Sequence, residues 1–473
     1  MNSKALKICS LFVVMAVVDI SCLNKKEHFE LLYSEPGTSE EHSALLGGEA
    51  SINDASPRAF SSPIPGLDNN EELEFFAGNT LFNKNWVTSP SSTKASDGLG
   101  PFFNSISCSS CHFKDGRGRA PEYVGEESTG YLLRLSVSGI NPNGSAAAHD
   151  IYGGQLQDQS INGVESEGSF SITYSAVMGQ FDDGSTYELR EPSISINGNY
   201  GAFGGVNISP RVANQMIGLG LLEAIAEEDI LTLADPTDQN NDGITGRPNY
   251  VWDFKQLDRR LGRFGWKANQ PDLYQQTCGA FLGDIGITTN LFSEQNCTSS
   301  QQDCQNSTHG GSPEITEDNL ISVVNYTRSL AVPIQRNVEK IEVLAGTKIF
   351  KDLNCSGCHI PKMETSIHPY VPALSNQKIQ PYTDLLLHDM GPGLADNAPD
   401  FLATGSEWRT PPLWGIGLFQ IVNGHTNYLH DGRARNIEEA ILWHGGEAEN
   451  SVEEYKKLSI DDRGNLLEFL NSL

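Results

Sequence analysis

Two short segments with the same pattern constrain this chain more than any other feature. They are Cys108-Ser-Ser-Cys111-His112 and Cys355-Ser-Gly-Cys358-His359, and each is a Cys-x-x-Cys-His motif. This spacing is the attachment signature of c-type haem, because two thiols bind the vinyl groups while the adjacent His reaches the iron. A zinc site or a redox-active dithiol would explain the Cys pairs but not a His after each pair. The sequence therefore predicts two covalently bound haem c groups, with His112 and His359 as iron ligands.

The N-terminus has the pattern of an export signal. Lys4 and Lys7 precede an apolar run at 11–18 that is too short to span a membrane, and Cys22 follows it. We expect residues 1–22 to be a signal peptide and Cys22 to be lipidated as in bacterial lipoproteins, although Asp19 stands where such signals usually carry Leu. Plain cleavage and an uncleaved anchor are the alternatives. Residues 23–65 are polar and aperiodic, which predicts a tether.

Charge and composition limit the classes of partner. Acidic residues outnumber Lys and Arg by 60 to 32, giving a net charge of −28, and such a surface repels nucleic acid and anionic membranes. We therefore expect no nucleic-acid partner, and contact with a membrane only through the lipid anchor. The protein would face the periplasm or the surface of a bacterium. The 473 residues suffice for two domains, and 46 Gly with 23 Pro indicate a chain rich in loops.

A short internal repeat surrounds the two motifs. The string Ala-Gly-x-x-x-Phe occurs at 77–82 and 345–350, and the string aromatic-x-x-Ser-Leu ends each unit at 326–330 and 469–473. Beside the first string, Leu73 and Phe76 fall at helical spacing and predict one face of a helix. A helix, the motif, a variable middle and a terminal helix are typical of small cytochrome c domains. We expect a mainly α fold with two cytochrome c-like haem domains, at 66–332 and 337–473.

The first unit is longer because it carries an insertion. Residues 131–137, 169–174 and 186–190 are β-rich and alternate in polarity, which predicts a small antiparallel β-sheet. Further on, Asp238, Asn240 and Asp242 occupy positions one, three and five of a loop that resembles an EF-hand. Asn249 stands where the bidentate Glu would be. Calcium binding and an ordinary Asx-rich turn therefore explain the loop equally well.

The C-terminal half carries strings that resemble a known family. They are Leu-Leu-Leu-His-Asp-Met-Gly-Pro-Gly-Leu-Ala-Asp at 385–396, Trp-Arg-Thr-Pro-Pro-Leu-Trp-Gly at 408–415, Tyr-Leu-His-Asp-Gly-Arg-Ala at 428–434 and the segment 437–448. With Gly-Leu-Gly-Pro-Phe-Phe-Asn at 98–104, they resemble the di-haem oxidoreductases over a span from about Asn70 to the C-terminus. This family is related to the bacterial di-haem cytochrome c peroxidases and to MauG-type enzymes.

His444 is the candidate sixth ligand of the second iron. It shares one face of a predicted helix with Ile437 and Ala440, behind an N-cap at Asn436. In the related peroxidases the distal ligand lies fourteen residues after the His of an x-His-Asp-Gly turn, and here His430 is followed at that distance by His444. The resemblance thus implies ligation by His359 and His444. A core His bonded to a carbonyl is the alternative. His388 and Met390 are rival ligands, and Arg409, Arg433 and Arg435 could pair with propionates.

The first haem has no comparable candidate for a sixth ligand. His149 and Met178 are the His and Met of the insertion, and we expect both to be structural. An iron without a sixth protein ligand can bind peroxide or oxygen. A peroxidase also needs a distal carboxylate or amide to move protons. The chemically suitable residues, among which the sequence does not distinguish, are Glu122, Glu126, Glu127, Gln155 and Gln180. Four tryptophans could bridge the haems or pack on them: Trp86, Trp408, Trp414 and Trp443.

These features together predict an exported oxidoreductase that is similar to the peroxidases. The first haem would reduce a small oxidant such as hydrogen peroxide, and the second would receive electrons from a donor cytochrome or cupredoxin. An electron carrier with two six-coordinate haems is the first alternative. A haem oxidase similar to MauG or to the rubber oxygenases is the second.

Overall fold

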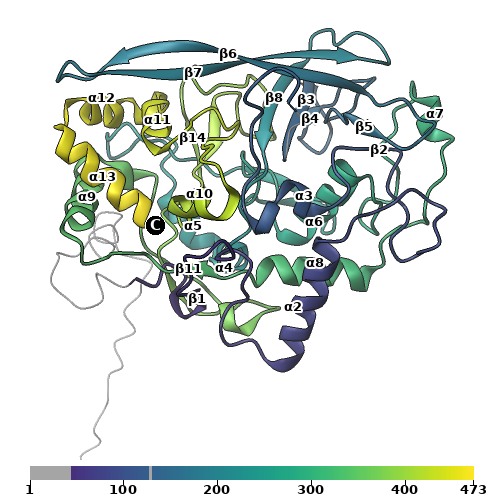
Figure 1. Cartoon of the computed structure of the whole chain (residues 1–473), viewed down its shortest axis with the longest axis horizontal. Coiled ribbons are helices and arrows are strands. Elements are labelled where there is room, and N and C mark those ends of the chain that lie inside the picture. Colours follow the sequence, from purple (N-terminus) through teal and green to yellow (C-terminus); the bar gives the residue numbers. More distant parts are fainter. Residues whose placement is uncertain (1–43, 127–129) are drawn as a thin grey trace, which may run out of the picture. The chain divides into compact units, whose positions relative to one another are not determined.

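A computed structural model of the chain describes residues 44–126 and 130–473 (Figure 1). The predicted signal peptide, Cys22 and the first part of the predicted tether lie outside the described residues. Within the part that is described, no helix is both long and apolar enough to cross a membrane.

Each Cys-x-x-Cys-His motif follows a helix that crosses a later helix at a glycine. α2 (Asn69–Phe82) packs on α8 (Glu317–Arg328), and α9 (Ile341–Asp352) packs on α13 (Ile460–Ser472). In Figure 1 these are the purple helix with a green one and a green helix with a yellow one. A Cβ on Gly78 of α2 would lie 2.1 Å from the Ser322 carbonyl oxygen, and one on Gly346 of α9 would lie 2.1 Å from that of Asn465. The glycine of the repeated string thus lets two helix backbones touch.

The crossing also brings the repeated aromatic residues against the motif histidines. The Phe82 ring lies 5.3 Å from Tyr326 and 6.1 Å from the His112 ring. The Phe350 ring lies 5.3 Å from Phe469 and 6.5 Å from the His359 ring. Both repeated strings therefore serve one purpose, which is to seat a pair of helices beside each motif.

Antiparallel strands occupy much of the chain between the first motif and α8. β3 (Tyr131–Ile140) pairs with β8 (Asn207–Val212) and with β4 (Ala146–Ala147). β6 (Gly168–Gln180) and β7 (Thr186–Gly198) form a separate long hairpin, which runs along the top of Figure 1. The three segments in which the sequence predicts strands lie in β3, β6 and β7, but these strands belong to two sheets instead of one.

The expectation of a mainly α fold with two cytochrome c-like domains is wrong. The chain is 29% helical and 20% strand, with many small sheets. The repeated strings locate the helices beside the motifs, and alternating polarity locates β3, β6 and β7, whereas most of the other strands have only two to four residues and are too short to show a period. The other helices are α3 (Cys108–Cys111), α4 (Leu219–Ala224), α5 (Glu227–Leu233), α6 (Leu273–Ala280), α7 (Gln302–Gln305), α10 (Phe419–Asn423), α11 (Ile437–Leu442) and α12 (Glu449–Lys457). The other strands are β1 (Ser51–Ile52), β2 (Phe102–Phe103), β5 (Gln159–Ser160), β9 (Tyr250–Asp253), β10 (Asp258–Leu261), β11 (Val332–Pro333), β12 (Met363–Glu364), β13 (Lys378–Ile379), β14 (Leu387–Asp389) and β15 (Glu407–Arg409).

One hydrophobic core extends through the regions of both motifs. It includes Leu46 and Phe60, which are fully buried, and β1 pairs in parallel with β11. Residues 44–65, the second part of the predicted tether, are therefore packed into the fold, because apolar side chains recur among their polar ones. The domain boundaries at 66–332 and 337–473 stay a prediction.

Replacement of the crossing glycines tests the role of the repeat. We expect Gly346→Ala to lower the free energy of unfolding by about 1–3 kcal/mol, because the new methyl group meets a backbone carbonyl that cannot move aside cheaply. Gly464→Ala, at an exposed position of the partner helix α13, is the matched control, since its Cβ would meet no atom within 4 Å. That control should raise stability by about 0.5–1 kcal/mol. Denaturant unfolding of both variants measures the difference, and equal effects would contradict the crossing.

Candidate functional site

The first motif lies at the edge of a large cavity. α3 carries Cys108 and Cys111, His112 follows, and all three line a space of about 1740 Å³ that is partly open to solvent. The His112 Nδ1–H donates to the Asn214 carbonyl oxygen at 2.7 Å, so Nε2 is the nitrogen left for a metal. Burial lowers the pKa of His112, which keeps its imidazole neutral as a metal ligand must be.

The second motif repeats this arrangement around a second cavity. Cys355, Cys358 and His359 line a space of about 1510 Å³ that is also partly open. The His359 Nδ1–H donates to the Tyr382 carbonyl oxygen at 2.9 Å. Burial lowers the pKa of His359 to about 4, so this imidazole is neutral too. Each motif therefore presents two thiols and one oriented imidazole to a cavity.

His444 faces the second cavity, together with His359. Asn436 caps α11 through its side chain, which accepts a hydrogen bond from the Glu439 backbone N–H at 2.8 Å, as the sequence predicts. Beyond the end of α11, the His444 Nδ1–H donates to the Ala440 carbonyl oxygen at 2.6 Å. The ring is thus fixed by its own helix, with Nε2 left free of that bond, and it lines the same cavity as the second motif.

The two rival ligands of the second iron differ in availability. Both line the cavity, but His388 bonds Asp384 through Nε2 and Glu447 through Nδ1, each at 2.7 Å. Because neither nitrogen is left over, His388 is a poor ligand. Met390 is partly buried and lines the cavity, so it stays a rival ligand.

The first cavity has no second histidine in its lining, as far as the described residues go. His149 is buried elsewhere, and its Nδ1 accepts the Ile151 backbone N–H at 3.1 Å. Met178 is 65% exposed on β6. Met216 is the methionine of the lining, and it belongs to the segment whose Asn214 carbonyl holds His112. The two cavities thus differ in the ligands that they offer.

A partly buried carboxylate that the sequence did not single out lines the first cavity. This is Asp284, in a π-helical turn at Phe281–Ile285, the kind of helix irregularity that is frequent at functional sites. Gln155 Nε2 donates to Asp284 Oδ1 at 2.9 Å and to Asn104 Oδ1 at 2.6 Å. Asn104 Nδ2 donates in turn to Asp158, whose pKa is raised by burial. A chain of acids and amides therefore leads away from the cavity wall.

Of the acid and amide candidates from the sequence, only Gln155 is near the first cavity among those described. Glu122 and Glu126 pair with Arg119, and Gln180 bonds the Gly184 carbonyl oxygen in an exposed turn. Glu127 lies outside the described residues. Sequence reasoning missed Asp284 because a single Asp in a helical segment has no local signature.

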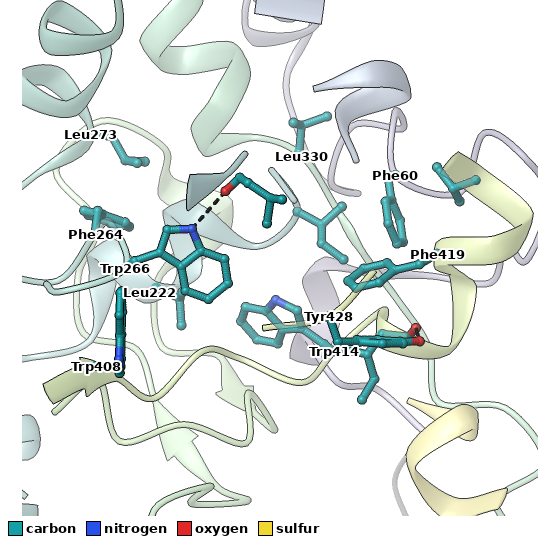
Figure 2. Close-up of a cluster of buried hydrophobic side chains, with 14 of the residues drawn as sticks. Phe60, Leu222, Phe264, Trp266, Leu273, Leu330, Trp408, Trp414, Phe419 and Tyr428 are labelled. Atoms are coloured by element: carbon teal, nitrogen blue, oxygen red, sulfur yellow. Dashed lines mark hydrogen bonds between the residues drawn. The ribbon is translucent and has the colours of Figure 1, made fainter. Parts of the chain in front are cut away.

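The two cavities share a wall. Five residues line both of them: Gln215, Trp266, Arg409, Pro411 and Pro412. Figure 2 draws Trp266 in its cluster of buried side chains, where its indole N–H donates to the Val212 carbonyl oxygen at 2.9 Å. Of the four tryptophans proposed from the sequence, Trp408 lines the second cavity and stacks on His430 at 3.7 Å, whereas Trp86, Trp414 and Trp443 line neither. Trp266 therefore has the bridging position that the sequence did not assign.

Two buried guanidinium groups at the cavities have no carboxylate partner. Arg409 bonds the carbonyl oxygens of Gly265 and Thr410, and Arg117 bonds that of Leu429. Neither forms an ion pair with a described residue, and the Arg117 Nε has no partner there. Burial lowers the pKa of each to about 10, which reflects the cost of an unpaired buried charge. By contrast, Arg433 pairs with Asp431 and Arg435 with Glu439.

These features fit haem in both cavities. The thiols stand in pairs that no disulfide joins, the oriented imidazoles can bind iron, and the unpaired guanidinium groups match the anionic propionates. His430 adds a neutral imidazole to the second cavity, since burial lowers its pKa to about 3.

The alternatives to haem fit the motifs less well. The two Cys pairs line different cavities, and no cluster of three or more His, Cys, Asp or Glu suited to a metal ion occurs in the described residues. Burial raises the pKa of Cys108 to about 12 and of Cys111 to about 11, whereas a reactive dithiol needs a lowered pKa.

The EF-hand-like loop is closed by its own hydrogen bonds. Asp238 and Asn240 accept the Asp242 backbone N–H, each at 3.0 Å, and Asn240 donates to Asp242 at 2.8 Å. Asn249, at position twelve, is buried and bonds the Lys267 carbonyl oxygen instead of facing the loop. These bonds favour the Asx-rich turn over calcium, which stays a prediction.

Comparison with known proteins agrees with this geometry. A family model described as "di-haem oxidoreductase, putative peroxidase" matches residues 41–137 and 157–473. No curated protein and no solved structure matches the chain. Because the family model covers most of its length, the chain belongs to the di-haem oxidoreductase family.

Proposed function

We propose that this protein is an exported c-type di-haem oxidoreductase of the peroxidase type. The first cavity is the place where a small oxidant such as hydrogen peroxide reacts, and the second relays electrons to it. The observation that carries this proposal is the inequality of the cavities. The second has both His359 and His444 in its lining, whereas His112 is the one histidine in the lining of the first, as far as the described residues go. An iron with an open position can bind an oxidant, and an iron held by two imidazoles suits electron transfer.

The chain's own residues would hold one haem in each cavity. Cys108 with Cys111, and Cys355 with Cys358, would hold the haems through thioether bonds, and His112 and His359 would bind the irons. Arg117 and Arg409 would pair with propionates, which removes the cost of their unpaired burial. When bound, haem supplies the iron chemistry that reduces a peroxide.

Asp284 and Gln155 supply the proton handling that peroxide reduction needs. Two electrons and two protons turn one hydrogen peroxide into two waters, so a group at the cavity must take up and return a proton. The Asp284 carboxylate lines the first cavity, and the Gln155 amide bonds its Oδ1 and so leaves Oδ2 for the substrate. Asp158, behind Asn104, is the next acid of this chain.

Electrons would cross the shared wall from the second cavity to the first. Trp266 and Arg409 line both cavities, so no further layer of protein separates the two sites at this point. The net charge of −28 favours a donor with a basic docking face, and a small cytochrome or cupredoxin is the class that we propose. Export and a lipid anchor at Cys22 belong to the same proposal, because c-type haem attachment and such donors both suit a periplasmic setting.

Loss of the thiols tests covalent attachment. We expect the double variant Cys108→Ser with Cys111→Ser to lose one haem, and Cys355→Ser with Cys358→Ser to lose the other, because each pair holds its own group. Cys278→Ser, which removes a buried thiol outside both cavities, should keep both. Intact mass spectrometry of the denatured proteins counts the haems. A wild-type protein whose mass equals that of the polypeptide alone would contradict c-type attachment.

Removal of the carboxylate tests Asp284. We expect Asp284→Asn to lower peroxide turnover about 100-fold or more, because an amide cannot take up the proton. Glu122→Gln, which alters an exposed carboxylate, should leave turnover within twofold. Both variants should bind cyanide at the first haem as the wild type does, which separates proton handling from access. The assay is peroxide consumption with a reduced donor. Unchanged turnover in Asp284→Asn would exclude this carboxylate from the reaction.

A further inference from the structure

His388 is held between two carboxylates at the second cavity. It lies on β14 and is 2% exposed, with Nε2 at 2.7 Å from Asp384 Oδ2 and Nδ1 at 2.7 Å from Glu447 Oε2. Ionised carboxylates only accept hydrogen bonds, so both ring nitrogens must donate. The ring also meets the second motif, because its Nδ1 lies 3.4 Å from Cys358 Sγ.

Glu447 is the point where three segments meet. Besides the bond from His388, its carboxylate accepts the Thr245 backbone N–H at 2.8 Å, the Thr245 hydroxyl at 2.5 Å and the Asp389 backbone N–H at 3.1 Å. Charge-assisted bonds of this kind are stronger than neutral ones. Glu447 is therefore tied both to β14 and to the loop that carries Thr245.

The segment that Glu447 anchors begins with His444. α11 ends at Leu442, and Gly445 and Gly446 separate His444 from Glu447. A Cβ on Gly446 would lie 2.2 Å from the Asp389 carbonyl oxygen, so the glycine pair packs directly on the strand segment of His388. Two successive glycines leave a backbone free to move unless it is held from both sides.

We infer that His388 and Glu447 form a clamp that positions His444 over the second cavity. This inference rests on the proposed ligation of the second iron by His444. The bond from His444 Nδ1 to Ala440 fixes the imidazole from the helix side, and the bond between His388 and Glu447 fixes the backbone beyond the glycines. His388, as part of the His-Asp-Met-Gly string, is thus a positioning residue and not a ligand.

The clamp is tested from the Glu447 side with a loss variant and a conservative one. We expect Glu447→Ala to convert the second haem of the oxidised holoprotein from low-spin to high-spin, because His444 is no longer held at the iron. Glu447→Gln should keep the low-spin state, since the amide oxygen can still accept the bonds from the His388 Nδ1–H and the Thr245 backbone N–H. His388→Ala breaks the same bond from the other side and should match Glu447→Ala. The readout is the set of spin-state bands in the resonance Raman spectrum.

His368 provides the matched control. It is also a buried His bonded to a carboxylate, with Nε2 at 3.2 Å from Glu223 Oε2, but it lines neither cavity. His368→Ala should leave both haems in their wild-type spin states. The same spectral change in His368→Ala would show that the effect is general destabilisation, and it would overturn the clamp.

The remaining outcomes separate this inference from the proposed function. A wild-type protein without a low-spin haem would contradict the His444 ligation and the clamp together. A low-spin haem in the wild type that persists in both Glu447→Ala and His388→Ala would overturn the clamp alone. A haem that becomes high-spin in Glu447→Gln as well as in Glu447→Ala would also overturn it, because the charge and not the bond would then decide the ligand state.

Discussion

The structure depends on two hydrogen bonds that orient the motif histidines. The Asn214 backbone carbonyl fixes His112, and the Tyr382 backbone carbonyl fixes His359. Asn214 lies 102 residues after His112, and Tyr382 lies 23 residues after His359. Each bond selects the tautomer whose Nε2 is available to iron. The crossing helices at Gly78 and Gly346 hold the aromatic rings beside these histidines, so the wider packing serves the same orientation.

The two cavities have similar motifs but differ in the side chains that line them. A pair of crossing helices accompanies the motif at each cavity, and the shared wall, which includes Trp266 and Arg409, sets the cavities next to each other. α11 then brings His444 to one of them, while the other faces Asp284 and its amide partners. The proposed division between a relay site and a reaction site rests on this difference in lining and not on the motifs, which are alike.

The sequence predicted the local features that carry a short signature. The Cys-x-x-Cys-His motifs, the N-cap at Asn436 and the helices before each motif all follow from adjacent residues. The face of the first helix did not, because Leu73 and Phe76 are 69% and 56% exposed while Phe75 and Phe82 pack inside. Helical spacing finds an apolar stripe, but which stripe is buried depends on where the partner helix lies. Asp284 and Trp266 were missed for the same reason, since only the tertiary fold brings them to the cavities.

The most direct test of unequal haem sites is the low-temperature EPR spectrum of the purified, fully oxidised protein. We predict one high-spin ferric haem, from the cavity whose lining has His112 as its single histidine, beside one low-spin haem with two histidine ligands. The open reaction site would be contradicted if both haems were low-spin and the first haem stayed low-spin after partial reduction. The protein would then be an electron carrier.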